Sequence, residues 1–199
     1  RGCHEPQEEV VFDAVVKGLP SGSVMVELGA YWSFYSTWLC EVVQNARVCL
    51  VEPLPKHLAM GRRNFKLNGY HGSFAQAYIG ASDGMEADGS RVVSVESLLE
   101  VAGHETIQLL HADVQGHELS MLQGARTLLE EHRIDYLFIS THRADLHASC
   151  EEFLRVRRYR ILASANLEET YSSDGILVAC SPRVTPPAFA PPSKRGRPG

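Results

Sequence analysis

Short apolar runs alternate along the chain with segments whose apolar residues recur every three or four positions. A continuous apolar run is typical of a strand that is buried on both faces, and the longer spacing is typical of a helix that packs on a sheet. The pattern predicts strands over 24–29, 47–52, 74–81, 107–114 and 136–141. It predicts helices over 5–19, 36–44, 55–68, 95–101, 117–131 and 146–157.

The alternation of strands and helices indicates the fold class. Parallel strands joined by helices require right-handed crossovers, which place helices on both faces of the sheet. Two further apolar runs, 160–165 and 175–180, have only a polar loop between them, so we expect an antiparallel pair at the edge. The sequence therefore predicts an α/β fold, doubly wound and Rossmann-like, with a mainly parallel seven-stranded sheet and an antiparallel C-terminal strand.

Composition divides the chain into three expected parts. Residues 1–22 form an N-terminal helix, residues 23–181 form the folded domain, and residues 182–199 form a Pro-rich basic tail that is expected to be disordered. The net charge of −5 is mixed along the chain and offers no broad basic surface, so nucleic acid is not the expected partner. The five scattered cysteines predict reduced thiols and a cytoplasmic location, and no apolar run predicts a membrane span.

The turn after the first predicted strand favours a nucleoside ligand without phosphates. Ligands of doubly wound sheets bind at the carboxyl ends of the strands, where Gly29 lies. A dinucleotide site needs further glycines beside its pyrophosphate, but this chain has Tyr31 and Ser33 there. Glu52 ends the second strand, where a carboxylate can accept two hydrogen bonds from a ribose diol. With Glu27 and Gly29 it favours S-adenosylmethionine over a nicotinamide cofactor.

Four segments together resemble a known family: VELGAYWSFYS, VEPLPKHLAMGRRNFKLNG, LLHADVQGHELSMLQGA and FISTH. From about residue 24 to residue 141 the chain is similar to the FkbM-type S-adenosylmethionine-dependent methyltransferases. It departs from the family's usual Asn-x-Gly, because Tyr31-Trp32-Ser33 stands there. The resemblance implies a class I methyltransferase domain over 23–181. It also implies methylation of a hydroxyl oxygen on a small molecule, such as a sugar or a polyketide-like acceptor.

The same resemblance implies which residues contact the cofactor. Glu27 and Gly29 are expected at the methionine end, and Glu52 at the ribose. Ser36, which opens the first helix after the turn, is expected near the cofactor carboxylate, where the helix N-terminus favours negative charge. The expected adenine contacts are Ala81, Ser82 and Asp83.

Histidines at the tips of the fourth and fifth predicted strands are the candidate bases. His111 and Asp113 lie on one side of an extended strand, and His142 follows the next strand. We interpret His142 or His111 as the base that removes the hydroxyl proton, and Asp113 as its orienting partner or as a substrate or cofactor contact. Alternatively, these three residues bind a divalent metal such as Mg²⁺, which would lower the pKa of the acceptor hydroxyl.

The acceptor site is expected beside the same strand tips. Aromatic faces suit both sugar rings and a sulfonium cation, so Tyr31 is also a candidate cofactor contact. The candidate acceptor contacts are Tyr31, Trp32, Tyr35, His117 and Glu118. Because the loops 84–90 and 166–174 are short, the site is expected to be open or to be completed by a second subunit of a homo-oligomer.

Three other functions compete with this interpretation. The tail sequence Arg195-Gly196-Arg197-Pro198 resembles an AT-hook, which would make the chain a DNA-binding protein. A nicotinamide oxidoreductase is disfavoured by the missing glycines. A cofactor-binding protein without turnover is the third alternative, because a doubly wound fold does not by itself establish a reaction.

Overall fold

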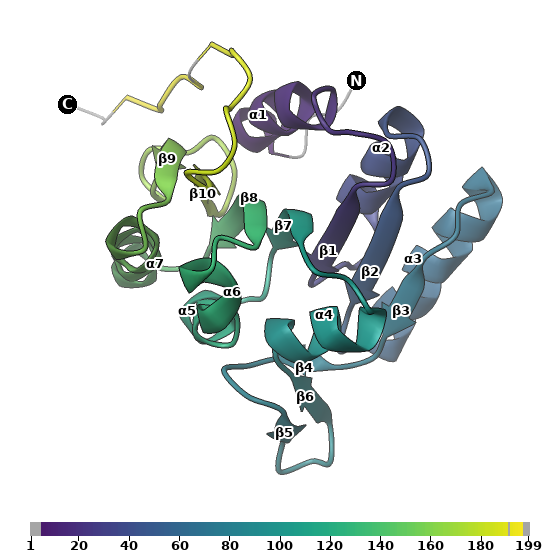
Figure 1. Cartoon of the computed structure of the whole chain (residues 1–199). Coiled ribbons are helices and arrows are strands. Elements are labelled where there is room, and N and C mark those ends of the chain that lie inside the picture. Colours follow the sequence, from purple (N-terminus) through teal and green to yellow (C-terminus); the bar gives the residue numbers. More distant parts are fainter. Residues whose placement is uncertain (1–4, 191, 197–199) are drawn as a thin grey trace.

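A seven-stranded sheet forms the centre of the protein in a computed structural model, which describes residues 5–190 and 192–196 (Figure 1). In spatial order its strands are β3 (Ser73–Ala75), β2 (Arg47–Val51), β1 (Val24–Leu28), β7 (Ile107–Ala112), β8 (Ile134–Thr141), β10 (Gly175–Cys180) and β9 (Arg160–Ala165). The first five are parallel, and β10 is antiparallel to both of its neighbours. The predicted doubly wound sheet with an antiparallel C-terminal strand is confirmed.

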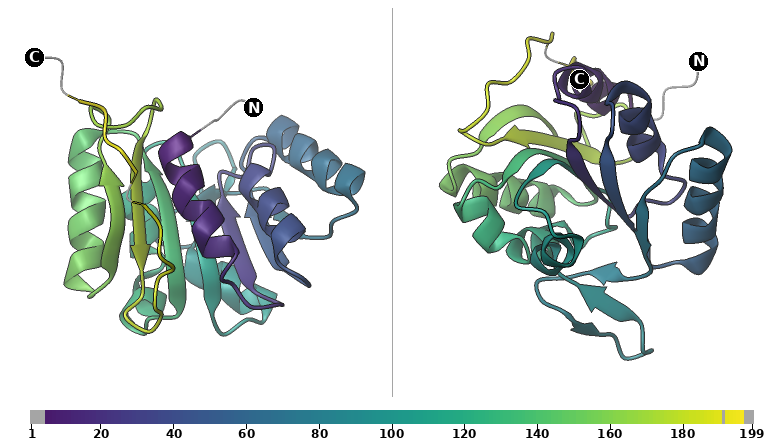
Figure 2. Two further views of the ribbon diagram at one scale, coloured as in Figure 1. Left: turned by 90° about the horizontal axis from the view of Figure 1, so that it is seen from above. Right: turned by 45° about the vertical axis from the view of Figure 1, so that its right-hand side comes forward.

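Helices cover both faces of this sheet, as Figure 2 shows. One face carries α1 (Pro6–Val16), α2 (Phe34–Val42) and α3 (Pro55–Asn68). The other face carries α4 (Val95–Ala102), α5 (Glu118–Gln123), α6 (Arg126–Glu130) and α7 (Ala144–Val156). None of the described helices is both long and apolar enough to cross a membrane.

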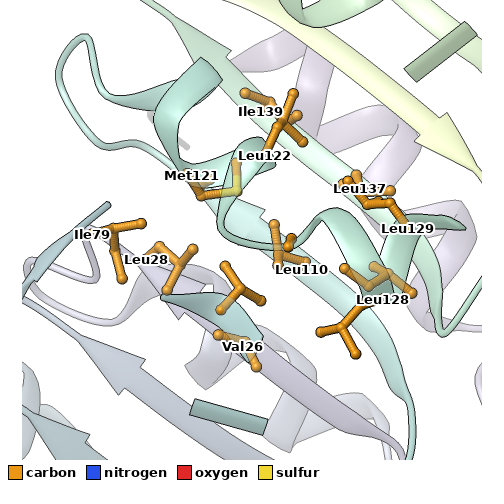
Figure 3. Close-up of a cluster of buried hydrophobic side chains, with 14 of the residues drawn as sticks. Val26, Leu28, Ile79, Leu110, Met121, Leu122, Leu128, Leu129, Leu137 and Ile139 are labelled. Carbon is orange, nitrogen blue, oxygen red and sulfur yellow. The ribbon is translucent and has the colours of Figure 1, made fainter. Parts of the chain in front are cut away.

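The two faces of the sheet hold two separate hydrophobic cores, and the strand pleat assigns side chains to them. In β1, Val26 and Leu28 point to the α4–α7 core, part of which Figure 3 shows, and Met25 points to the α1–α3 core. Because side chains alternate along a strand, Glu27 shares the face of Met25. His111 of β7 pairs with Glu27 in register and shares that face. Two polar side chains therefore lie side by side at the top of an apolar core.

The strand predicted over 74–81 is wrong as a single element. The chain leaves the main sheet after β3 and forms β4 (Tyr78–Ile79), which pairs with β6 (Arg91–Val93). With β5 (Gly84–Met85) these strands make a small separate sheet, which projects from the body in Figure 1. An apolar run looks the same in sequence whether it forms one strand or two, so the pattern did not indicate the break between β3 and β4.

The helix predicted over 117–131 is broken at Gly124 into α5 and α6. The Gly124 carbonyl accepts a hydrogen bond from the Glu96 amide, and Glu96 Oε1 accepts one from the Thr127 amide at 2.6 Å. A Cβ on Gly124 would lie 2.2 Å from the Gly80 carbonyl oxygen. The break at Gly124 therefore lets the backbone between α5 and α6 approach the backbone at Gly80 closely.

The C-terminal tail forms neither a helix nor a strand within its described residues, 182–190 and 192–196. Val184 and Phe189 pack against the α1–α3 core. Lys194 forms an ion pair with Glu169 at 2.9 Å, and Figure 2 shows this yellow segment close to β9 and β10. The expected division at residues 22 and 181 stays a prediction. Residues 197 and 198 of the AT-hook-like motif lie outside the described residues.

Candidate functional site

A cavity of about 450 Å³ opens at the carboxyl ends of β1, β2 and β7. This is the edge where doubly wound sheets bind ligands. The cavity is lined by Gly29, Tyr31, Glu52, Pro53, Leu54, His57, Ala77, Tyr78, Ile79, Asp113, Val114, Gln115 and His117. A cavity of similar volume at the amino ends of β1 and β2 has no carboxylate on its wall. The first cavity therefore joins apolar walls to a few convergent polar groups, as ligand sites do.

The turn after β1 needs glycine where the strand ends. Gly29 has φ of +73°, and a Cβ there would lie 1.7 Å from the Asp113 carbonyl oxygen, so β1 and β7 touch at this point. Tyr31 and Ser33 also have positive φ, at 41° and 67°. These are the positions where the family usually has Asn and Gly, residues that adopt left-handed backbone at low cost. Tyr31 and Ser33 therefore hold backbone conformations that strain residues with a side chain.

Glu52 is fixed at the cavity wall by the backbone around it. Its Oε2 accepts from the Tyr31 amide at 3.0 Å, and its Oε1 accepts from the Leu54 amide at 2.9 Å. A carboxylate has about four acceptor positions, so each oxygen can accept one more hydrogen bond. Glu52 is thereby held in one orientation with acceptor capacity left for the two hydroxyls of a ribose.

Glu27 and Ser36 are buried and do not line the cavity. Glu27 is 3% exposed and accepts a hydrogen bond from the Ser36 amide at 3.1 Å. Burial raises the pKa of Glu27, against the lowering effect of the nearby His111. Ser36 is fully buried, and its amide is used by Glu27. The structure therefore does not place Ser36 where it could contact a cofactor carboxylate.

The segment that lines this part of the cavity is shifted along the chain from the residues expected to contact adenine. Ala77, Tyr78 and Ile79 line the cavity, whereas Ala81, Ser82 and Asp83 do not. Asp83 instead accepts a hydrogen bond from the Ser94 amide at 2.8 Å and fixes the entry to α4. The shift follows from the strand end, which was expected near residue 81 but occurs at Ala75. A correct strand end would have pointed to the residues that follow it.

His142 lies at the end of β8 among three carboxylates. Its Nδ1 is 2.6 Å from Glu118 Oε1. Its Nε2 is 3.2 Å from Asp113 Oδ1 and 3.5 Å from Asp174 Oδ1, but it has no aligned hydrogen-bond partner among the described residues. One ring nitrogen is therefore anchored by a fully buried carboxylate, and the other faces Asp113 at the cavity. Asp174 was not singled out in the sequence, because it comes from a polar loop distant in the chain.

These carboxylates set the charge of the imidazole. Contact with Asp113 and then Glu118 outweighs burial and raises the pKa of His142 to about 10. Burial favours the neutral form of Asp113, but the contact with His142 outweighs it and lowers the pKa of Asp113. At neutral pH the site thus holds an imidazolium, and at alkaline pH it holds a strong neutral base.

His111 lies apart from this group, so the expected set of His111, Asp113 and His142 is not gathered as metal ligands. His111 is 3% exposed, and its Nε2 lies 2.9 Å from Glu8 Oε1 on α1. The pleat of β7 turns it toward α1, whereas Asp113 lies beyond the strand end. The described residues bring together a different ligand group, Glu5, Glu8 and His111. The choice of ligands in the metal alternative was therefore wrong.

The predicted acceptor contacts have different environments. Tyr35 is buried at 3% exposure and donates to Glu5 Oε2 at 2.8 Å, so it belongs to the core rather than to an acceptor site. Tyr31 and Trp32 are 45% and 43% exposed, and Tyr31 and His117 line the cavity. Glu118 is fully buried behind His142. The sequence did not indicate His57, whose ring packs against that of Tyr31 at 4.3 Å.

Comparison with protein families gives one match that spans most of the chain. The model of the methyltransferase FkbM domain matches residues 27–161. This range contains the end of β1, all of β2, β7 and β8, and the residues around the cavity. No curated protein matches the chain.

Solved structures of methyltransferases share the fold. An rRNA methylase from Streptococcus thermophilus superposes with a TM-score of 0.61 and 12% identity, over 85% of this chain and 93% of that chain. A precorrin-6y C5,15-methyltransferase from Geobacter metallireducens gives 0.58 and 15%, over 86% of each chain. Aeropyrum pernix fibrillarin with bound S-adenosyl-L-methionine gives 0.53 and 14%, over 83% and 72%. At these identities the likeness shows the fold alone.

Proposed function

Because the chain belongs to the FkbM methyltransferase family, we propose that it moves the methyl group of S-adenosylmethionine to a hydroxyl oxygen of a small molecule. When bound, S-adenosylmethionine supplies a methyl group on a sulfonium. The protein's part is to hold the two reactants in line and to take up the hydroxyl proton. The observation that carries the proposal is His142, which is anchored at one ring nitrogen by Glu118 and faces Asp113 of the cavity with the other.

The cavity at the ends of β1, β2 and β7 fits the proposed cofactor. Glu52 offers acceptor capacity for a ribose diol, and Gly29 keeps the floor of the cavity free of a side chain. Ala77 and Ile79 supply apolar wall for a flat base. The contact of Glu27 with the methionine end of the cofactor stays a prediction, because Glu27 is buried and does not line the cavity. Contacts of Tyr31 and Asp113 with the cofactor stay predictions.

His142 is the proposed base, and Asp113 and Glu118 are the residues that position it and raise its basicity. Methyl transfer to a hydroxyl leaves a proton, which Nε2 of a neutral His142 would accept. Tyr31, Trp32 and His117 are the proposed acceptor contacts at the cavity mouth. This arrangement needs no metal ion at His142.

The character of the cavity wall favours a small neutral acceptor over nucleic acid. None of the residues that line the cavity is a lysine or an arginine. A phosphate-bearing acceptor gains most of its affinity from such residues. Asp113, Glu118 and Asp174 surround His142 instead and would repel a phosphate. A sugar or a similar hydroxyl compound meets no such repulsion.

Methyl transfer is expected to appear on oxygen and to accelerate with rising pH. The protein is incubated with S-adenosylmethionine labelled with ¹³C in its methyl group and with a panel of sugars, phenols and matched amines. NMR spectroscopy then separates O-methyl from N-methyl products. Because only neutral His142 accepts a proton, the rate should rise as pH approaches its pKa of about 10. In Glu118→Gln the imidazole loses a neighbouring negative charge, so the rise should move to lower pH by about one unit or more.

The matched control is Glu152→Gln, which removes an exposed carboxylate on α7 and should leave the pH profile in place. Direct ¹⁵N NMR titration of the His142 ring gives the same pKa without any acceptor. Methylation of amines alone would contradict the choice of oxygen. A His142 pKa that does not move in Glu118→Gln would contradict the proposed base.

A further inference from the structure

A buried polar cluster lies between α1 and the sheet, beside Glu27, and none of its members lines the cavity. It consists of Glu5, Glu8 and His111, which are 8%, 1% and 3% exposed. Glu8 comes from the first turn of α1 and His111 from β7, so the cluster joins elements about 100 positions apart in the chain. Figure 2 shows α1 lying across this face of the sheet. The proposed methyl transfer uses none of these three side chains.

The geometry of the cluster is that of an open ligand set. One ligand atom from each residue lies within 4.8 Å of the other two. His111 Nε2 is 2.9 Å from Glu8 Oε1, yet neither atom has an aligned hydrogen-bond partner among the described residues. The second ring nitrogen of His111 also has none there. Polar atoms buried in this way normally have a partner. Glu8 Oε1 and His111 Nε2, with Glu5 beside them, therefore point to a bound group.

Neighbouring hydroxyls hold the carboxylates in place. Tyr35 donates to Glu5 Oε2 at 2.8 Å. Ser140 is within 3.3 Å of Glu5 Oε1 and 3.4 Å of Glu8 Oε2. Glu8 Oε1 is left to face His111. Partners that orient ligand side chains in this way are a regular feature of metal sites.

The charge of the cluster also favours a cation. The carboxylates of Glu5, Glu8 and Glu27 gather around one imidazole, and no lysine or arginine of the described residues forms an ion pair with Glu8 or Glu27. Two buried carboxylates, those of Glu8 and Glu27, beside one imidazole make this part of the interior favourable for a cation.

We propose that Glu5, Glu8 and His111 bind a divalent transition-metal ion, of which Zn²⁺ is the best match. One imidazole nitrogen and two carboxylate oxygens form a ligand set that Zn²⁺ accepts in tetrahedral sites, with a fourth position for a hydroxyl or water. The ion would connect α1 to β7 through the side chains of Glu8 and His111, and it would take the position of a proton on the His111 ring.

Zinc binding is tested on the whole chain, without any methyl-transfer assay. After treatment with a chelator, the protein is titrated with Zn²⁺ by calorimetry, and the zinc complex is examined by X-ray absorption. The expected result is about one ion per chain, held by nitrogen and oxygen atoms at about 2.0 Å, with a higher Tm when zinc is present. Glu8→Gln should weaken binding by about 100-fold or more.

The matched control is Asp13→Asn, which removes a carboxylate of the same helix that pairs with Lys17 and should leave zinc binding unchanged. No binding by the wild-type chain would overturn the proposal. Equal affinity in Glu8→Gln, or a coordination shell dominated by sulfur, would also overturn it. If Glu8→Gln does not fold, the shell seen by X-ray absorption in the wild-type protein still decides between these outcomes. The result is independent of whether the proposed methyl transfer is correct.

Discussion

Replacing Gly29 with alanine is expected to abolish cofactor binding and to lower the free energy of unfolding by about 3 kcal/mol or more. Two costs add at this position. The backbone has φ of +73°, which an L-residue with a side chain adopts only with strain. The new Cβ would also lie 1.7 Å from the Asp113 carbonyl oxygen, so β1 and β7 must separate where they form the floor of the cavity.

Gly22→Ala separates the two costs. Gly22 has φ of +79°, but a Cβ there has no heavy atom within 4 Å, so only the backbone strain of about 1 kcal/mol applies. Urea unfolding of both variants measures the difference, and calorimetry with S-adenosylhomocysteine measures binding. If Gly29→Ala unfolds no more easily than Gly22→Ala and still binds the nucleoside, the close contact between Gly29 and Asp113 has no role in the site.

Glu52→Gln is expected to reduce the affinity for S-adenosylhomocysteine by about 10- to 150-fold, which corresponds to 1.5–3 kcal/mol for hydrogen bonds to a charged group. The substitution keeps the shape of the side chain but removes its charge. The carboxylate now accepts hydrogen bonds from the backbone amides of Tyr31 and Leu54. In glutamine, the NH₂ group would face one of these two amides, and that hydrogen bond would be lost. Both the ribose contact and the turn that carries it are weakened.

The 2′-deoxy analogue of S-adenosylhomocysteine distinguishes these two effects. If Glu52 binds the ribose diol, the wild-type protein should lose affinity for the analogue, and Glu52→Gln should show little further loss. If the losses of affinity caused by Glu52→Gln and by removal of the 2′-hydroxyl simply add, Glu52 acts only on the turn. Calorimetric titration of the four combinations gives this coupling directly.

Local signals made several elements predictable to the residue. The helix α3 was expected over 55–68 and has those bounds, because Pro55 opens it and Gly69, with φ of +72°, ends it. Both β9 and β10 also have their expected bounds, since each is an apolar run between polar loops. Gly29 and Glu52 both line the cavity, and each directly follows a strand, whereas their contacts with the cofactor stay predictions. The sequence pattern therefore predicts which residues lie at the end of a strand.

Side-chain direction and contacts between distant segments were not predictable in the same way. The sequence places His111 and Asp113 two residues apart. The His111 side chain, however, contacts Glu8 of α1, a helix that begins about 100 positions earlier in the chain. Asp174 reaches His142 from a loop whose composition indicates only a turn. Tyr35 was expected at the acceptor site because it is near Gly29 in sequence, yet the helix turns it into the core. Such outcomes depend on packing between elements rather than on local pattern.

Calorimetric titration of the purified chain with S-adenosylhomocysteine, beside NADH, tests the central claim most directly. The proposed site accepts a nucleoside with an amino-acid tail and has no glycine-rich turn for a pyrophosphate. The expected result is micromolar binding of S-adenosylhomocysteine at about one site per chain and no comparable binding of NADH. Absence of S-adenosylhomocysteine binding, or binding of NADH with equal affinity, would contradict the assignment of the cavity as a methyl-donor site.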